Sequence, residues 1–487
     1  MKRSFDPNGV SLPIGHWIHG EYVEGPGRIE LLRPSDGAAY FSCPIADAVM
    51  VDRAVQSAKN ALRTSGWATC HPRDRAKILR RWADLIEAEA EELGRLEALA
   101  STRPISQAVA IDVMVTAEQI RFFAEFADKE GGHVVPTDSR HLGMILSEPY
   151  GVIGAITPWN VPLSMAGWKL APALAAGNAV VLKPSEMTPF STLYMAVLAS
   201  RAGIPAGIVN IVLGDGLVTG TSLVGHPDVA KISFTGSTVA GGAILRTIAE
   251  TNIKPMTLEL GGKSPQLVFA SADIDRAAAS IAKGIQNNAG QACVAGSRVI
   301  VDESIVRPLL DKLRPAMSFY RAGETWAEET DYSPIISEPQ LKRIEGIVQA
   351  AVGAGAHCIL GGHRLDRAGY FYAPTILGDV SADSPALTEE IFGPVITLQT
   401  FKEEEEAYEL GGHAIYGLAA GVFTADLSQA IRAVNRIEAG TVWVNRYGRS
   451  LDHILPTGGY KSSGIGKDLG RESYKASRRQ KSVLIEL

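Results

Sequence analysis

The pattern that most constrains the fold begins near residue 150, where short apolar runs alternate with segments of helical character. Strands are predicted at 152–156, 179–182, 209–213 and 231–234. Between the second and third strands, Thr188 and Pro189 favour a helix start and Gly203 a helix stop. This βαβ series predicts an α/β fold with a parallel sheet, helices on both faces and ligands at the carboxyl ends of the strands.

A second α/β unit is predicted to begin near Gly261. Its strands are expected at 266–269, 298–301, 358–360, 395–400 and 441–444. The segment 47–128 is predicted to be helical because its apolar residues recur at helical spacing, as at Ile78, Trp82 and Leu85. Since 487 residues exceed what one hydrophobic core usually serves, we expect two or more domains.

The composition is that of an ordinary soluble globular protein, with 46% hydrophobic and 21% charged residues. A formal net charge of −6 provides no basic field, so we expect no nucleic-acid partner. The apolar stretch 150–182 imitates a membrane span but contains Pro158, Pro162 and Pro172 as interruptions. We therefore expect a buried strand-and-loop region there and no membrane partner.

The four cysteines are scattered along the chain, at Cys43, Cys70, Cys293 and Cys358. Their spacing indicates neither a disulfide framework nor a metal site, which fits a reducing cytoplasm. No long apolar stretch precedes Pro13, and no secretory signal is therefore expected.

Two short strings carry the chemistry. Glu259 lies in Met-Thr-Leu-Glu-Leu-Gly-Gly-Lys-Ser-Pro, and Cys293 ends Asn-Ala-Gly-Gln-Ala-Cys. A thiol offers a nucleophile and a carboxylate a base, so the pair indicates an enzyme that forms a covalent thioester and hydrolyses it. A free thiol, with a pKa of about 8.5, is only a few per cent thiolate at neutral pH, so a helix terminus or dipole should raise that fraction at Cys293. The alternative for Cys293 is a buried structural role, which we assign to the other three cysteines.

These strings, together with Thr157-Pro-Trp-Asn160 and Glu389-Glu-Ile-Phe-Gly-Pro-Val395, resemble the aldehyde dehydrogenase superfamily over nearly the whole chain. The resemblance implies NAD(P)-dependent oxidation of a small-molecule aldehyde to a carboxylic acid. Cys293 would be the nucleophile, and Glu259 would activate the water that hydrolyses the thioester. The Asn160 amide and the Cys293 backbone N–H would hold the oxyanion.

The cofactor site is predicted from a loop and from the resemblance. Gly236 and Ser237 follow a strand and open a helix, whose free N–H groups can hold a pyrophosphate. By resemblance, Lys183 and Glu186 hold the adenosine ribose, and the Glu186 carboxylate repels a 2′-phosphate, so NAD is favoured over NADP. The whole predicted set is Thr157, Pro158, Trp159, Lys183, Ser185, Glu186, Gly236, Ser237, Leu260, Gly261, Glu390 and Phe392.

The resemblance also implies two doubly wound α/β domains with a small β oligomerisation arm. Residues 1–128 and 150–260 would form a discontinuous NAD-binding domain, and 261–461 the catalytic domain. The arm, 129–149, would pair with the C-terminal tail, 462–487, of a partner subunit in a homodimer or homotetramer.

Matching outward from Cys293 and Asn160 by resemblance places eight residues around the aldehyde: Val161, Ser164, Met165, Trp168, Lys283, Asn287, Ala292 and Val294. The loop 446–455 would cap the mouth and contributes Arg446, Arg449, Asp452 and His453. Lys283 and Arg449 either pair with a carboxylate at the far end of a semialdehyde or point to solvent. The first alternative predicts a polar or anionic aldehyde.

Two motifs depart from the family pattern. Thr457 replaces the aromatic of a typical Pro-Phe-Gly-Gly, which changes the expected mouth of the tunnel. Ser101-Thr-Arg-Pro104 replaces the usual Gly-Lys-Pro and is expected not to affect the chemistry.

Three other functions remain as alternatives. The first is acyl transfer to coenzyme A and the second is reduction of an acyl phosphate, both on the same fold. Glu259 argues against both, because neither reaction needs a hydrolytic base. The third is a non-enzymatic protein that kept the fold, which the intact motifs disfavour.

Overall fold

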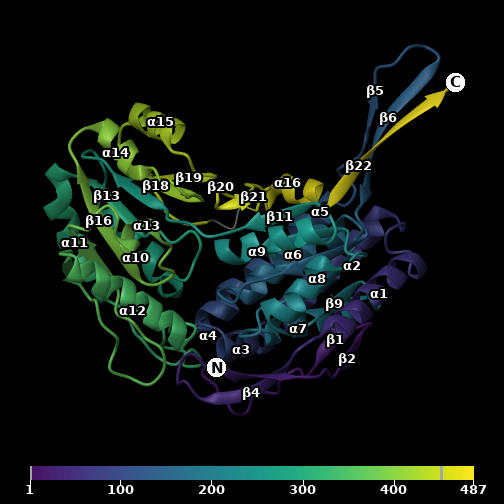
Figure 1. The fold of residues 1–487 in the computed structure, drawn as a ribbon, viewed down its shortest axis with the longest axis horizontal. Helices are drawn as coiled ribbons and strands as arrows, with labels where there is room; N and C mark the ends of the chain where they lie inside the picture. Colours follow the sequence, from purple (N-terminus) through teal and green to yellow (C-terminus); the bar gives the residue numbers. More distant parts are fainter. Residues whose placement is uncertain (1–2, 450–452) are drawn as a thin grey trace.

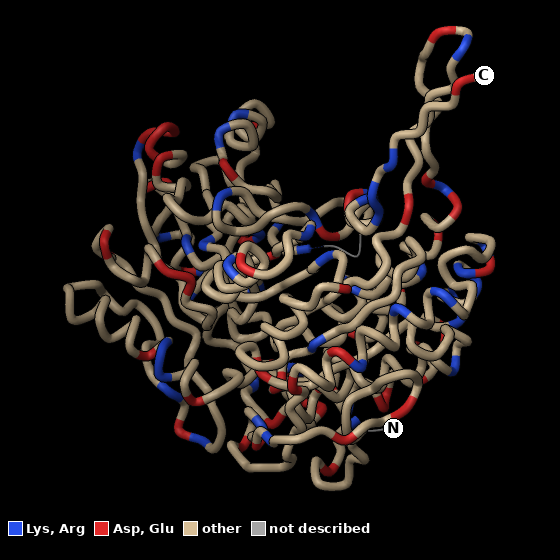
Figure 2. Tube along the Cα trace, turned by 45° about the vertical axis from the view of Figure 1, so that its right-hand side comes forward, with Lys and Arg blue, Asp and Glu red and all other residues tan. Residues whose placement is uncertain are grey.

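The computed structural model describes residues 3–449 and 453–487 and has a mixed α/β architecture. Two twisted sheets, each covered by helices, form the body, and an arm of three strands projects from it (Figure 1). Acidic and basic residues are intermingled along the trace (Figure 2). None of the helices among the described residues is long and apolar enough to span a bilayer.

The first sheet has the order β2-β1-β9-β8-β7-β10-β11-β21. Its strands are β1 (His16–Ile18), β2 (Glu21–Val23), β7 (Val152–Ile156), β8 (Ala179–Lys183), β9 (Val209–Ile211), β10 (Lys231–Thr235), β11 (Met256–Glu259) and β21 (Gly464–Ile465). The four strands predicted here are confirmed, within two residues at their ends. From β7, pairing runs to β8 and β9 on one side and to β10 and β11 on the other, always parallel. Such a switch point is where doubly wound sheets bind ligands.

The helices of this half are α1 (Ala48–Thr64), α2 (Pro72–Ala88), α3 (Ala90–Ala100), α4 (Ile105–Gln107), α5 (Met114–Phe126), α6 (Pro162–Ala175), α7 (Phe190–Ala202), α8 (Thr221–Gly225) and α9 (Thr238–Glu250). The helical prediction for 47–128 is confirmed, with a π-helical segment, Ala108–Val113, between α4 and α5. Gly203 ends α7 in the left-handed conformation, as predicted.

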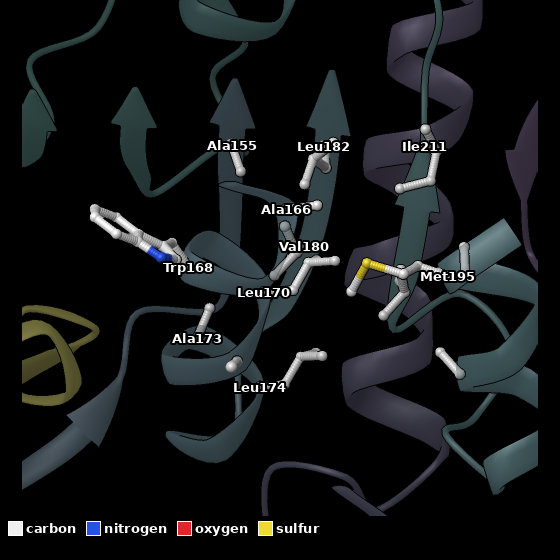
Figure 3. Close-up of a cluster of buried hydrophobic side chains, with 14 of the residues drawn as sticks. Ala155, Ala166, Trp168, Leu170, Ala173, Leu174, Val180, Leu182, Met195 and Ile211 are labelled. Atoms are coloured by element: carbon white, nitrogen blue, oxygen red, sulfur yellow. The ribbon is translucent and has the colours of Figure 1, made fainter. Parts of the chain in front are cut away.

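The expectation of strand and loop across 150–182 is confirmed at its ends, where β7 and β8 lie, but it is wrong in between, because α6 occupies Pro162–Ala175 with every residue buried. Pro162 opens this helix, where a missing N–H costs nothing, and Pro172 lies in its last turn. Leu170 lies beside the sheet residue Val180, whereas Trp168 points away from the other labelled side chains (Figure 3). The helix therefore buries one side against the sheet and presents Trp168 elsewhere.

The second sheet has the order β14-β15-β16-β13-β12-β18-β19 and is parallel except for β14. Its strands are β12 (Pro265–Val268), β13 (Arg298–Asp302), β14 (His357–Leu360), β15 (Thr375–Gly378), β16 (Val395–Phe401), β18 (Ala419–Phe423) and β19 (Thr441–Val444). Its helices are α10 (Ile274–Gln286), α11 (Val306–Ser318), α12 (Glu338–Gly353), α13 (Pro385–Thr388), α14 (Glu404–Gly411) and α15 (Leu427–Arg436). The five predicted strands are confirmed, while β15 and β18 were not predicted.

The arm consists of β5 (His133–Val135), β6 (His141–Pro149) and the C-terminal strand β22 (Arg478–Glu486). Here the prediction that the arm pairs with a partner's tail is wrong, because β22 pairs with β6 of its own chain from Arg478 opposite Pro149 to Glu486 opposite His141. The reason lies in α16 (Gly470–Ala476), which packs beside α5 and directs the tail toward the base of the arm. Arg471 forms an ion pair with Glu130 there.

Two small two-stranded sheets complete the structure. They pair β3 (Arg28–Leu32) with β4 (Ala39–Pro44), and β17 (Tyr416–Gly417) with β20 (Tyr460–Lys461).

Candidate active site

A cavity of about 950 Å³ brings the predicted catalytic residues together. It is lined by segments that follow β7, β10 and β11 of the first sheet and by the loop before β13 and the loop after β19 of the second. Cys293, Glu259 and Asn160 all line it. The chemistry predicted from separate strings is therefore gathered at one place.

Cys293 lies in the loop between α10 and β13 and is partly buried. Burial raises the pKa of its thiol to about 11, and the Arg449 guanidinium opposes this rise. The prediction of a lowered thiol pKa is therefore wrong, since desolvation of the thiolate outweighs the favourable charge of Arg449. The thiol must lose its proton to a base when it reacts.

Glu259 ends β11, so its side chain sits at the carboxyl edge of the first sheet. The side chain is buried, and its Oε1 forms no hydrogen bond with any described residue. Burial raises the pKa of the carboxyl group to about 8, and the negative charge of Asp468 adds to the rise. A carboxyl group with a pKa near neutrality is suited to general base catalysis.

A buried ion pair that we did not predict lies beside Glu259. Lys169 of α6 donates to Asp468 at 2.5 Å, and both residues are almost fully buried. Asp468 raises the pKa of Glu259, while Lys169 lowers it. Sequence signalled neither partner, because 299 residues separate them.

Asn160 follows β7 and is 6% exposed. Its Nδ2 donates to the Gln291 carbonyl at 2.9 Å, two residues before Cys293. An amide nitrogen carries two protons, so the second N–H is available to an oxyanion.

The cofactor face of the cavity is built around glycines. The Gly262 N–H donates to Glu390 Oε1 at 3.0 Å. A Cβ at Gly261 would lie 2.4 Å from Glu390 Oε2, so only glycine allows this approach. Trp159 and Phe392 meet edge to face at 5.2 Å. This cradle offers a carboxylate to ribose hydroxyls and an aromatic wall to a flat ring.

Eight of the twelve predicted cofactor residues line the cavity: Pro158, Trp159, Gly236, Ser237, Leu260, Gly261, Glu390 and Phe392. Gly236 lies between β10 and α9, and the Ser237 hydroxyl caps α9, a helix of 13 residues. The N-terminus of such a helix suits a pyrophosphate.

The other four lie outside the cavity lining: Thr157 follows β7, Lys183 ends β8, and Ser185 and Glu186 follow β8. Lys183 is buried and donates to the Gly214 carbonyl at 2.6 Å and to Glu186 at 3.5 Å. Glu186 remains about one third exposed, so its carboxylate can accept hydrogen bonds from hydroxyl groups. The residues present therefore fit a dinucleotide.

The substrate face contains all eight predicted tunnel residues. Arg449 lies 4.8 Å from the centre of the Trp168 ring and donates to the Thr457 hydroxyl. Thr457 thus replaces the expected aromatic with an acceptor that holds Arg449. Lys283 and Asn287 are exposed. Asp452, predicted in the mouth loop, lies outside the described residues.

Part of the tunnel wall was missed. Arg103 lines the cavity with Asp112 and Gln119, and it pairs with Asp112 at 2.7 Å and 3.1 Å. The stretch Ser101-Thr-Arg-Pro104, which is expected not to affect the chemistry, thus contributes Arg103 to the cavity wall. The helical spacing of the sequence does not predict that Asp112 faces the cavity, because Asp112 lies in the π-helical segment Ala108–Val113, which departs from the α-helical repeat.

Comparison with known proteins agrees with this geometry. The aldehyde dehydrogenase family profile matches residues 22–483. An aldehyde dehydrogenase of Aspergillus niger is 43% identical over 468 residues, which cover 95% of this chain and 94% of that protein. The solved structure of an indole-3-acetaldehyde dehydrogenase of P. syringae with NAD+ and IAA has a TM-score of 0.96 and 37% identity, and the match covers 99% of this chain and 98% of that one.

A solved γ-glutamyl-γ-aminobutyraldehyde dehydrogenase from Burkholderia cenocepacia has the same TM-score of 0.96, with 38% identity over 99% of this chain and 98% of that one. Full-length similarity in sequence and in structure leads to one conclusion: the chain belongs to the aldehyde dehydrogenase family.

Proposed function

We propose that this aldehyde-oxidising enzyme uses NAD and forms a thioester on Cys293 that is hydrolysed with Glu259 as base. The observation that supports this most is the shared cavity, which contains Cys293, Glu259 and Asn160 beside the Glu390 cradle. Solved relatives bind NAD+. A hydrolytic carboxyl group in the cavity disfavours transfer of the acyl group to coenzyme A.

In the first half-reaction the Cys293 thiol gives its proton to water, and the thiolate attacks the aldehyde carbon and forms the oxyanion of a thiohemiacetal. The Asn160 N–H that is not bonded to Gln291 and the Cys293 backbone N–H stabilise the oxyanion. NAD, when bound, supplies the acceptor for the hydride. Loss of the hydride leaves the acyl group on Cys293 as a thioester.

In the second half-reaction Glu259 removes a proton from the attacking water. The tetrahedral intermediate collapses, the Cys293 sulfur leaves as a thiolate, and the carboxylic acid departs. Burial raises the pKa of Glu259 most, Asp468 of the buried ion pair adds to the rise, and Lys169 opposes it.

For the cofactor, we propose NAD rather than NADP, since the Glu186 carboxylate would repel a 2′-phosphate. Residues 1–128 with 150–260 then serve as the NAD-binding domain and 261–461 as the catalytic domain. We assign 129–149 and 462–487 to assembly of a homodimer or homotetramer, and the unpaired cysteines fit a cytoplasmic location.

For the substrate, we propose a polar or anionic aldehyde. Arg449, Lys283 and Arg446 all line the cavity. Within residues 3–449 and 453–487, neither Lys283 nor Arg449 forms an ion pair, so their charges are available to a ligand. Relatives of similar identity are named for indole-3-acetaldehyde and for γ-glutamyl-γ-aminobutyraldehyde, so overall similarity does not decide the substrate.

The test is a spectrophotometric NADH assay over neutral, cationic and anionic aldehydes, with NAD and NADP in parallel. Cys293→Ala should lower turnover more than about a thousandfold, because no other group can form the thioester. NAD binding, measured by calorimetry, should stay nearly unchanged. Substantial turnover by this variant would refute the thioester mechanism, and equal kcat/KM for the two cofactors would refute the NAD preference.

A further inference from the structure

Three consecutive residues before the nucleophile adopt left-handed backbone conformations. The φ angles are 53° at Asn288, 49° at Ala289 and 70° at Gly290. Glycine is required at the third position, since a Cβ there would lie 2.1 Å from the Gly393 carbonyl oxygen. Asn288 and Ala289 are not glycine, so their conformations persist only if the surroundings hold them.

The Asn288 side chain is only 2% exposed. Both its amide oxygen and its amide nitrogen form hydrogen bonds that hold this turn. Its Oδ1 accepts from the Thr102 hydroxyl at 2.6 Å. Its Nδ2 donates to the Asn160 carbonyl at 2.8 Å and to the Gln291 carbonyl at 3.3 Å. One amide therefore ties together the segment before α4, the loop after β7 and the loop of the nucleophile.

Gln291 fixes the other end of the turn and is fully buried. Its Nε2 donates to the Asn288 carbonyl at 2.9 Å and to the Pro334 carbonyl at 2.8 Å, and its Oε1 accepts from the Ile336 N–H at 2.9 Å. Its own carbonyl accepts both from Asn288 and from the Asn160 amide. The orientation of the Asn160 amide thus depends on this carbonyl.

We infer that Asn288 is a positioning residue, which sets the Asn160 amide against the backbone N–H of Cys293. The inference rests on the proposed function, in which these two groups share the oxyanion. Asn160 comes from the first sheet and Cys293 from the second, so a cross-link between them must fix their relative position. Small displacements of such donors weaken oxyanion stabilisation strongly.

The residue type at position 288 serves two purposes. Asparagine tolerates the left-handed region better than most residues, and its amide supplies the two donors and the acceptor. Glycine would satisfy the backbone and remove all three side-chain bonds. Asn288→Gly therefore separates the two purposes.

In Asn288→Gly we expect kcat/KM for the aldehyde to fall roughly ten- to hundredfold, with KM for NAD within about twofold. Alkylation of Cys293 by iodoacetamide should change less than about threefold, because that reaction forms no oxyanion. Asp379→Gly is the matched control, since Asp379 also has a φ of 53° but lies exposed after β15. It should behave as the unmodified protein.

A double-mutant cycle with Asn160→Ala decides the route of the effect. If Asn288 acts through Asn160, adding Asn288→Gly to Asn160→Ala should lower kcat/KM for the aldehyde by less than about a further threefold. If the losses of kcat/KM in the two single variants multiply in the double variant, the inference is overturned. Unchanged kcat/KM in Asn288→Gly, or a large fall in the rate of Cys293 alkylation, would also overturn it.

If Asn288→Gly does not fold, Thr102→Val serves instead. This substitution removes only the hydroxyl that donates to Asn288. We expect it to lower kcat/KM for the aldehyde about threefold, and this loss should disappear in the Asn160→Ala background. A loss that persists there overturns the inference. Absence of NAD-dependent oxidation in the unmodified protein would instead overturn the proposed function.

Discussion

The two faces of the cavity are built in different ways. On the cofactor and reaction face, short contiguous strings provide the backbone geometry, as where Gly261 and Gly262 let Glu390 approach. On the substrate face, single side chains arrive from distant segments, such as Arg103, Trp168 and Arg449. A motif can therefore predict the reaction, whereas the substrate depends on isolated positions that each family member can change.

The charges on the two faces also differ. Burial raises the pKa of Glu259 to about 8 and that of Glu390 to about 7, so the reaction face carries carboxyl groups that are near their titration points. The substrate face carries Arg449, Lys283 and Arg446. The contrast predicts pH-dependent chemistry on one face and selection by charge on the other.

After Cys293→Ala, the largest effect is expected from Glu259→Gln on the reaction face. The amide cannot take a proton from water, so steady-state turnover should fall on the order of a thousandfold. A stopped-flow burst of NADH, about one per active subunit, should precede the slow phase, because thioester formation does not need the hydrolytic base. Normal steady-state turnover would exclude Glu259 as that base, and loss of the burst would move its role to activation of Cys293.

The pH dependence should follow from the raised pKa of Glu259, which is about 8. The base must be ionised, and below this pKa it is mostly protonated, so the deacylation rate should rise with pH. The expected rise is about tenfold per pH unit in the acidic range and levels off above the pKa. A single-turnover hydrolysis assay of the thioester measures it, and a flat profile between about pH 6 and about pH 9 would contradict it.

Most strands of the fold were predictable because β-branched residues mark buried parallel strands. The missed strand β18, which lies between β12 and the edge strand β19, reads Ala-Ala-Gly-Val-Phe, and its small residues do not show the β-branched pattern. Local sequence patterns also do not predict that β18 pairs with β12, which lies about 150 residues earlier in the chain. The pairing of the tail was mispredicted for a similar reason, since the residues of β22 do not themselves show which arm they pair with, and the packing of α16 decides it.

The site residues were predictable where they lie in a contiguous sequence motif, as Glu259 and Cys293 do. The thiol pKa was not, because burial of Cys293 arises from loops that meet only in the folded chain. The Arg103 and Asp112 pair was missed because it spans Pro104 and the π-helical segment, which follow no simple period. Tertiary packing, rather than local pattern, decided these features.

The smallest predicted effect concerns the substrate face. Arg449 is held by Thr457 and Trp168, with no carboxylate of the described chain in an ion pair with it. A substrate carboxylate would therefore gain charge-assisted hydrogen bonds of about 1.5–3 kcal/mol, which correspond to roughly ten- to a hundredfold in kcat/KM. Lys283 is exposed, so its contribution should be only a few fold.

The measurement is the ratio of kcat/KM for succinic semialdehyde to that for hexanal. Arg449→Met should lower this ratio about tenfold, and Lys283→Met by less, since methionine keeps much of the apolar stem while removing the charge. Activity with hexanal serves as the internal control, because an alkyl chain cannot use either cation. If hexanal matches succinic semialdehyde in the unmodified enzyme, or if neither variant changes the ratio, the two faces of the cavity do not differ in charge selection. Substrate choice would then depend on the shape of the wall formed by Trp168 and Met165.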